Sequence, residues 1–131
     1  MIVLDTHVLV WWVSDPPRLS AAAKRIINQT LRKRPVSVSA ISVLEITTAV
    51  RRGRLALRTP IEQWLTDARA LPELHFESVT VEVAALAGGF DETLPGDPAD
   101  RIIVATALSL GAKLVTADER LRKIQHLASV W

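Results

Sequence analysis

Four acidic residues occupy positions from which their side chains can share one site. Asp5 closes the first apolar run, Glu45 lies in a helical pattern, Asp100 opens another helix, and Asp118 follows an apolar segment typical of a strand. Residues at the carboxyl ends of parallel strands gather in one crevice of an open α/β sheet, where such sheets bind ligands. Carboxylate oxygens grouped there suit a hard divalent cation.

Each acid also has a purely structural explanation. Asp5 and Asp118 can be the N-caps of the helices that follow them. Asp97 can cap the next helix in the same way, and Asp100 then lies in the first turn, where the helix dipole favours an acid. We expect Asp97 to be mainly a cap, whereas Asp100 can serve the helix and a metal together.

For Glu45 the structural explanation is a capping box, because it stands three residues after Ser42. An apolar stripe that includes Ile41 indicates instead that the helix starts nearer Ser39. Glu45 then lies past the first turn and beside the apolar face. A carboxylate in that position needs a partner, because burying an unpaired charge is costly.

The acids constrain the function more strongly as a group. Two like charges about 4 Å apart repel by roughly 4 kcal/mol at an effective dielectric of about 20, so a cluster without a cation is strained. Mg²⁺ or Mn²⁺ relieves this repulsion and leaves room for water and phosphate oxygens. The sequence therefore predicts a phosphodiester substrate.

Alternating strand-like and helix-like segments predict an α/β fold with a mainly parallel sheet. Short apolar or alternating runs indicate strands at 2–4, 36–39, 76–79, 113–115 and 127–131. Helical periodicity, caps and Pro or Gly boundaries indicate helices at 8–13, 21–34, 41–50, 59–71, 81–87, 97–110 and 119–124.

The length of 131 residues predicts a single domain over residues 1–131. The absence of Cys excludes disulfides, thiolate metal sites and cysteine nucleophiles. The first residues lack the basic stretch of a signal peptide, and no apolar run approaches the ~18 residues of a membrane span. We therefore expect a soluble, cytoplasmic protein without membrane contact.

Charge is distributed unevenly although the net charge is only +2. Residues 18–58 contain ten Lys or Arg and one acid, whereas residues 59–100 contain nine acids and one Arg. Such asymmetry favours a polyanion or a charged partner, although solvated helix faces are the simpler explanation for any single run of charge.

Four segments, taken in order, resemble the motifs of the PIN-domain family. They are Asp5-Thr6, residues 42–46 (Ser-Val-Leu-Glu-Ile), residues 97–107 (Asp-Pro-Ala-Asp-Arg-Ile-Ile-Val-Ala-Thr-Ala) and residues 114–118 (Leu-Val-Thr-Ala-Asp). The chain is most similar to VapC-type toxins, the ribonuclease halves of type II toxin–antitoxin pairs. The resemblance implies one PIN-like nuclease domain, a three-layer α/β/α sandwich with a central mainly parallel sheet.

The resemblance also implies a metal-dependent endoribonuclease that hydrolyses RNA with a metal-activated water. Its acidic quartet would be Asp5, Glu45, Asp100 and Asp118, with Mg²⁺ or Mn²⁺ as cofactor. The expected direct metal ligands are Asp5, Asp100 and Asp118, and Asp97 is a further acid that can take the place of Asp100. Glu45 would position the water or the metal, while Thr6 and Thr116 would orient the acids or water.

The partners implied by the resemblance are RNA, a cognate antitoxin and a second copy in a homodimer. Arg51, Arg52 and Arg54 can steer RNA or meet an acidic antitoxin segment. Arg101, beside Asp100, is expected to contact phosphate or to pair with a carboxylate. Two departures from the family pattern, at His7 and Gly96, leave the choice of RNA open but remove no acid.

Other functions fit the sequence less well. A PIN-like RNA-processing nuclease outside a toxin–antitoxin pair would carry the same acids. A Mg²⁺-binding phosphatase or receiver-like domain would want a second Asp at the position of His7 or an Asp after a third strand, and the chain has neither. A non-catalytic binding module would leave the acids unexplained. The three histidines are expected to be structural or on the surface, not general bases.

Overall fold

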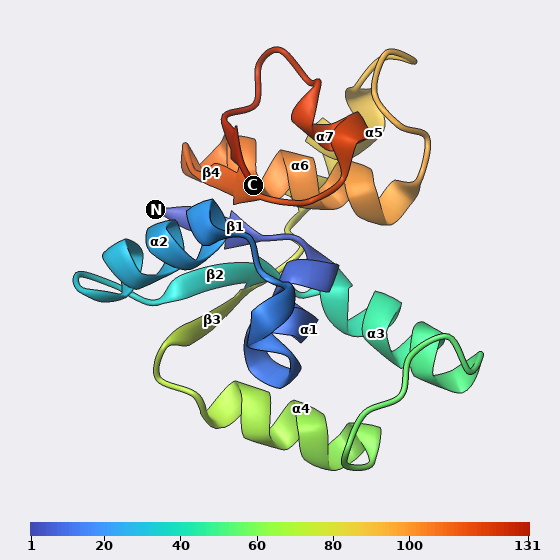
Figure 1. Ribbon diagram of the computed structural model, residues 1–131. Helices are drawn as coiled ribbons and strands as arrows, with labels where there is room; N and C mark the ends of the chain where they lie inside the picture. The colour runs from blue at the N-terminus through green and yellow to red at the C-terminus, as the bar shows by residue number, and fades with distance from the viewer.

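A central sheet with helices on both sides forms the protein, as shown in Figure 1, in a computed structural model that describes residues 1–131. All strand pairs are parallel, and the strand order is β3-β2-β1-β4-β5. The strands are β1 (Ile2–Leu4), β2 (Val36–Ser39), β3 (Leu74–Glu77), β4 (Lys113–Val115) and β5 (Ser129–Val130).

Seven α-helices and one short 3-10 helix connect these strands. They are α1 (Thr6–Ser14), η1 (Pro16–Arg18), α2 (Ala21–Leu31), α3 (Ile41–Arg51), α4 (Ile61–Ala70), α5 (Val81–Gly89), α6 (Pro98–Leu110) and α7 (Glu119–Arg122). None of them is long and apolar enough to cross a membrane.

Successive side chains of β1 face opposite layers of the molecule. Ile2 and Leu4 pack in the larger core cluster with residues of α1, α2 and α4, whereas Val3 packs with residues of α6 and α7. Neighbouring side chains on a strand point to opposite faces, so a strand covered on both faces must be apolar throughout. Figure 1 shows α6 and α7 on one side of β1 and α1 and α4 on the other. The predicted α/β/α sandwich is therefore confirmed.

Several element boundaries differ from the sequence prediction. The third strand is Leu74–Glu77 instead of 76–79, because Leu74 pairs with Val36 at the start of β2. Helix α4, predicted from residue 59, begins at Ile61, and Pro60 is its N-cap. Three elements are shorter than predicted: α2 ends at Leu31, α7 ends at Arg122, and β5 contains only Ser129 and Val130. Helices α1 and α5 are longer than predicted, and the short helix η1 was not predicted.

The central place of β1 matters for the site. Its carboxyl end lies between the ends of β2 and β4, since it pairs with both. Asp5 follows β1 directly, α3 begins shortly after β2, and Thr116 follows β4. Helix α6 also contacts β1, β2 and β4. Residues that are distant in sequence are thereby brought to one edge of the sheet.

Candidate functional site

A groove of about 1010 Å³ lies at this edge, and all five predicted acids line it. Its walls come from α1, from α3 and the turn that follows it, from the start of α6, and from the turn after β4. The acids are Asp5, Glu45, Asp97, Asp100 and Asp118.

Asp5 is the most buried of the acids, with only 7% of its surface exposed. Thr116 Oγ1 donates to its Oδ2 at 2.6 Å, and the backbone N–H of Thr6 donates to its Oδ1 at 2.8 Å. Burial raises the pKa of Asp5, and these two hydrogen bonds oppose that rise. Asp5 is also the N-cap of α1, as the structural explanation predicted, and it lines the groove as well.

Glu45 is the fifth residue of α3, which begins at Ile41. Thr6 Oγ1 donates to Glu45 Oε1 at 2.5 Å, and Ser42 Oγ lies 2.8 Å from Thr6 Oγ1. A hydroxyl has a single proton to donate, so Ser42 must donate to Thr6 while Thr6 donates to Glu45. Ser42 is therefore an inner residue of the helix, fully buried, and the capping-box alternative is wrong.

Asp97 and Asp100 open α6 and lie opposite Glu45. Asp97 Oδ1 accepts hydrogen bonds from the backbone N–H groups of Ala99 at 2.8 Å and Asp100 at 3.2 Å, so the predicted cap is present. Burial raises the pKa of Asp100 to about 7, with further contributions from the negative charges of Asp97, Asp5 and Glu45. Burial likewise raises the pKa of Glu45.

Three of these acids fit a metal ion. Glu45, Asp97 and Asp100 each offer one carboxylate oxygen, and these oxygens all lie within 4.8 Å of one another. Oxygens that share one Mg²⁺ at 2.0–2.1 Å lie at most about 4.2 Å apart, so small side-chain movements suffice to close the shell. The donor set contains only hard oxygen ligands. Burial is the first cause of the raised pKa of Asp100, and the second is the negative charge of the neighbouring acids, which a cation would neutralise. Asp97 and Asp100 thus lie together, and Glu45 joins them as a possible ligand.

The Asp118 carboxylate is hydrogen-bonded to the side chain of Arg120. The guanidinium donates to Asp118 Oδ2 at 2.7 Å and Oδ1 at 3.2 Å, and it also reaches Asp100 Oδ2 at 3.2 Å. This hydrogen bonding lowers the pKa of Asp118. The Asp118 carboxylate also accepts from the Arg120 backbone N–H at 2.9 Å and caps α7. Arg120 was not among the residues predicted from the sequence. Its position two residues after Asp118, a predicted N-cap, could have indicated that the two side chains pair.

The predicted pairing of Arg101 with a carboxylate is wrong. Its side chain pairs with no carboxylate and is absent from the groove lining. Instead it donates to backbone carbonyls of the α5–α6 connection, and its guanidinium lies 5.7 Å from the ring centre of Phe90. The carbonyls are those of Ala87 at 3.0 Å, Asp91 at 3.3 Å, Pro95 at 3.5 Å, and Phe90. These hydrogen bonds hold the connecting segment against α6.

Only some of the arginines in the basic half of the chain lie in the groove. Arg54 lines the groove, whereas Arg51 and Arg52 are exposed on α3 and at its end, outside the groove lining. Arg18, which was predicted only as part of a basic block, also lines the groove. Its guanidinium lies 4.7 Å from the ring centre of Trp11.

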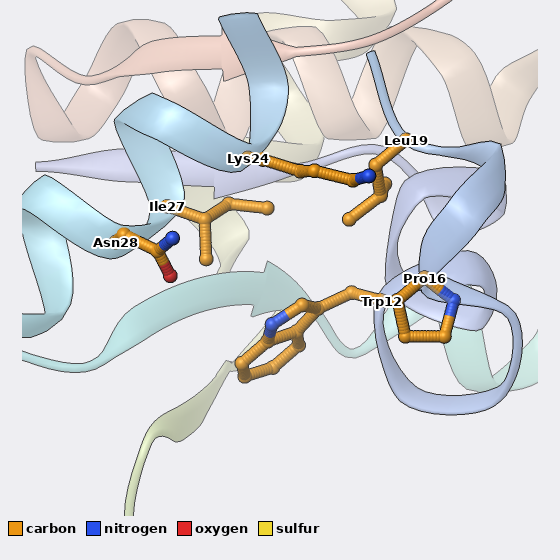
Figure 2. Close-up of a pocket in the computed structure, with 6 residues that line it drawn as sticks. All are labelled: Trp12, Pro16, Leu19, Lys24, Ile27 and Asn28. Carbon is orange, nitrogen blue, oxygen red and sulfur yellow. The ribbon is translucent and has the colours of Figure 1, made fainter. Parts of the chain in front are cut away.

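A second hollow, of about 260 Å³, lies between α1, η1 and α2 (Figure 2). It contains no acid and no histidine, so the acid-based chemistry belongs to the larger groove. Its lining consists of Trp12, Pro16, Leu19, Lys24, Ile27 and Asn28.

Known proteins share both the sequence pattern and the fold. Residues 2–127 match the PIN domain family. The chain is 38% identical over 125 residues to ribonuclease VapC22 of Mycobacterium tuberculosis, an alignment that covers 95% of this chain and 92% of that protein.

Several solved structures have a fold similar to that of this chain. VapBC2 of Rickettsia felis, bound to a DNA fragment from its promoter, matches with a TM-score of 0.72 at 17% identity, over 98% of this chain and 97% of that chain. FitAcB of Neisseria gonorrhoeae matches with a TM-score of 0.68 at 24% identity, over 98% and 96% of the two chains. At these identities the structures bear on the fold and its sheet topology.

Proposed function

This chain belongs to the PIN domain family, and on that basis we propose that it is a metal-dependent endoribonuclease of the VapC type. The observation that carries the proposal is the convergence of five acids, drawn from distant parts of the chain, in one groove. The similarity to a ribonuclease over nearly the whole chain supports RNA as the substrate. A phosphatase or receiver-like function loses its support, because the family match spans residues 2–127.

Mg²⁺ or Mn²⁺ is the proposed cofactor, held first by Glu45, Asp97 and Asp100. When bound, a divalent cation activates water for attack and offsets negative charge on the phosphate. Asp118 is available as a further ligand once Arg120 releases it, since both its oxygens are engaged by that residue. Asp5 is more deeply buried than these acids, and hydrogen bonds from Thr116 and Thr6 fix the orientation of its carboxylate.

The hydroxyl relay from Ser42 through Thr6 gives Glu45 a fixed orientation. Thr6 engages only Oε1 of Glu45, which leaves Oε2 for a metal or for the attacking water. Ser42 is fully buried and Thr6 nearly so, and this relay cannot reorient freely. Glu45 is therefore proposed to position the water or the metal, and Thr6 to act through Glu45.

RNA is proposed to enter along the wall that carries Arg18 and Arg54. Both residues line the groove, and neither takes part in an ion pair within the chain. Such groups can neutralise phosphates on either side of the bond that is cut. Arg51 and Arg52 lie outside the groove and are proposed to steer RNA at longer range, or to meet an acidic segment of the antitoxin.

We further propose that the chain acts as one PIN-like domain, forms a homodimer, and is silenced by a cognate antitoxin. The proteins of similar fold include VapBC2 and FitAcB, and another is a toxin–antitoxin complex from Klebsiella pneumoniae. An antitoxin partner distinguishes this proposal from a PIN-like nuclease that processes RNA alone.

The test is hydrolysis of a mixed-sequence RNA by the purified protein with added Mg²⁺ and with EDTA. Wild-type protein is expected to cleave only with the cation, and Glu45→Gln and Asp100→Asn are expected to lose cleavage while remaining folded by circular dichroism. Cleavage that persists in EDTA, or in both folded variants, would rule out the proposed function.

A further inference from the structure

Arg120 places a permanent positive charge inside the acidic groove. Its Nη2 lies 2.7 Å from Asp118 Oδ2 and 3.2 Å from Asp100 Oδ2, so one nitrogen bridges two acids. Its Nε adds a second bond to Asp118, through Oδ1 at 3.2 Å. No other Lys or Arg in the chain forms an ion pair with an acid.

We propose that Arg120 is an internal counter-ion that competes with the divalent cation for Asp100 and Asp118, and that it thereby sets the affinity of the groove for metal. The inference rests on the proposed function, because it concerns the same cation. It adds a residue that tunes the site without being one of its ligands.

The competition follows from charge and from geometry. A guanidinium stays protonated at every accessible pH, so it cannot yield its place by losing a proton. The positive charge and a cation that approached the same Asp100 oxygen would repel each other. The guanidinium therefore opposes the cation, which it repels unless it leaves Asp100, and the net affinity of the cation is reduced by the free energy of that repulsion or displacement.

The Arg120 side chain can move out of the groove, whereas the two acids that it contacts are largely buried. The side chain of Arg120 is 63% exposed, while those of Asp100 and Asp118 are only 13% and 26% exposed. An exposed side chain that forms an ion pair gains little from it, because water screens the attraction. The backbone N–H of Arg120 is bonded to Asp118 Oδ1, so the side chain can swing outward while α7 keeps its cap.

Removing the charge should therefore affect the metal-free and the metal-bound protein differently. Without Arg120 the acids lose their counter-charge, and the protein freed of metal by EDTA becomes less stable. With saturating cation the acids are neutralised in either case, so the loss of Arg120 should then matter little. The stabilisation that metal confers should consequently be larger in the variant, as linkage between binding and folding requires.

Calorimetric titration with Mn²⁺ tests the proposal on wild type, Arg120→Gln and Arg122→Gln. Arg122 is the matched control, because it lies on the same short helix, is exposed and pairs with no acid. We expect Arg120→Gln to bind Mn²⁺ about two- to fivefold more tightly than wild type, because the exposed ion pair that the cation displaces is weak, and Arg122→Gln to bind as wild type does. Arg120→Lys keeps the charge without the bidentate fork and should lie between wild type and Arg120→Gln.

Thermal unfolding in EDTA and in saturating Mg²⁺ supplies a second readout. The shift in melting temperature caused by Mg²⁺ should be larger for Arg120→Gln than for the Arg122→Gln control. Equal Mn²⁺ affinities in wild type and Arg120→Gln would overturn the role of Arg120 and leave the nuclease proposal standing. Failure of every variant and of wild type to bind Mn²⁺ would overturn both.

Discussion

Thr116 donates a 2.6 Å hydrogen bond to Oδ2 of Asp5, although the two residues lie 111 positions apart in the chain. The same hydroxyl accepts a hydrogen bond from the backbone N–H of Asp118 at 3.0 Å. One threonine therefore fixes a buried acid at the end of β1 and shapes the turn that presents the next acid after β4.

Thr116→Val keeps the shape of the side chain and removes the hydroxyl. The Asp5 oxygen then loses its donor in a buried position, which should cost about 1–3 kcal/mol of unfolding free energy. Urea unfolding in EDTA measures this cost, with Thr116→Ser as the control that retains the hydroxyl. Equal stability of the Val and Ser variants would show that the bond contributes nothing.

Mn²⁺ affinity should depend on pH through Asp100, whose pKa is raised to about 7 by burial and then by Asp97, Asp5 and Glu45. The carboxyl must lose its proton to bind a cation, so affinity should fall as pH falls through this value. We expect binding about tenfold weaker at pH ~6 than at pH ~8, because each pH unit below the pKa removes most of the ionised form. A flat profile measured by calorimetry would contradict this assignment.

The same pKa predicts how Asp100 affects stability once metal has been removed. The folded state binds the Asp100 proton more tightly than the unfolded state, so the contribution is present below the ordinary pKa of 3.8 and is lost as pH rises through about 7. Asp100→Asn should therefore stabilise the EDTA-treated protein at pH ~8 and change its stability little at pH ~4. Urea midpoints at the two pH values test the sign, and a variant less stable than wild type at high pH would reverse it.

Arg54 and Arg51 lie near each other in the sequence, but only Arg54 lines the groove. Arg54→Gln should raise the KM for RNA by about fivefold, with a smaller change in kcat, because it removes the proposed contact between the groove and an RNA phosphate. Arg51→Gln is the matched control and should change KM by less than about twofold. The salt dependence of RNA binding should become shallower in Arg54→Gln. Equal effects of the two variants would indicate steering by net charge alone.

Arg101 has a structural role in this fold, and Arg101→Lys separates that role from RNA binding. Lysine cannot donate to the several carbonyls of the α5–α6 connection at once, so we expect a loss of about 1–2 kcal/mol in unfolding free energy. The connection leads into Asp97, and Mn²⁺ affinity should weaken as well. A variant of unchanged stability but altered salt dependence of RNA binding would instead support a phosphate contact.

The sequence predicted what depends on local pattern and on the rules of parallel sheets. Asp5 after β1 and Asp118 after β4 were placed correctly because the carboxyl ends of adjacent parallel strands share one edge. Asp97 was predicted to be mainly a cap. It does cap α6, but it also lies beside Glu45 and Asp100, so the two roles do not exclude each other. A cap uses one carboxylate oxygen and leaves the other available.

The direction of long side chains could not be read from the sequence. Arg101 was expected at the acids, but its place on α6 directs it to carbonyls of a segment that itself has little regular structure. Arg120 was missed because its two acidic partners lie 2 and 20 residues away, and only the fold brings the second one near. Ser42 was considered as a cap, and its contact with Thr6 spans 36 residues.

The place of β1 in the middle of the sheet has a consequence during synthesis of the chain. Asp5 leaves the ribosome 111 residues before Thr116, and Asp118 follows Thr116 after β4. Because chains are made at about 5–20 residues per second, the groove stays open for several seconds after its first acid emerges. A nascent chain therefore lacks a complete set of acids until β4 and the turn that follows it have been translated.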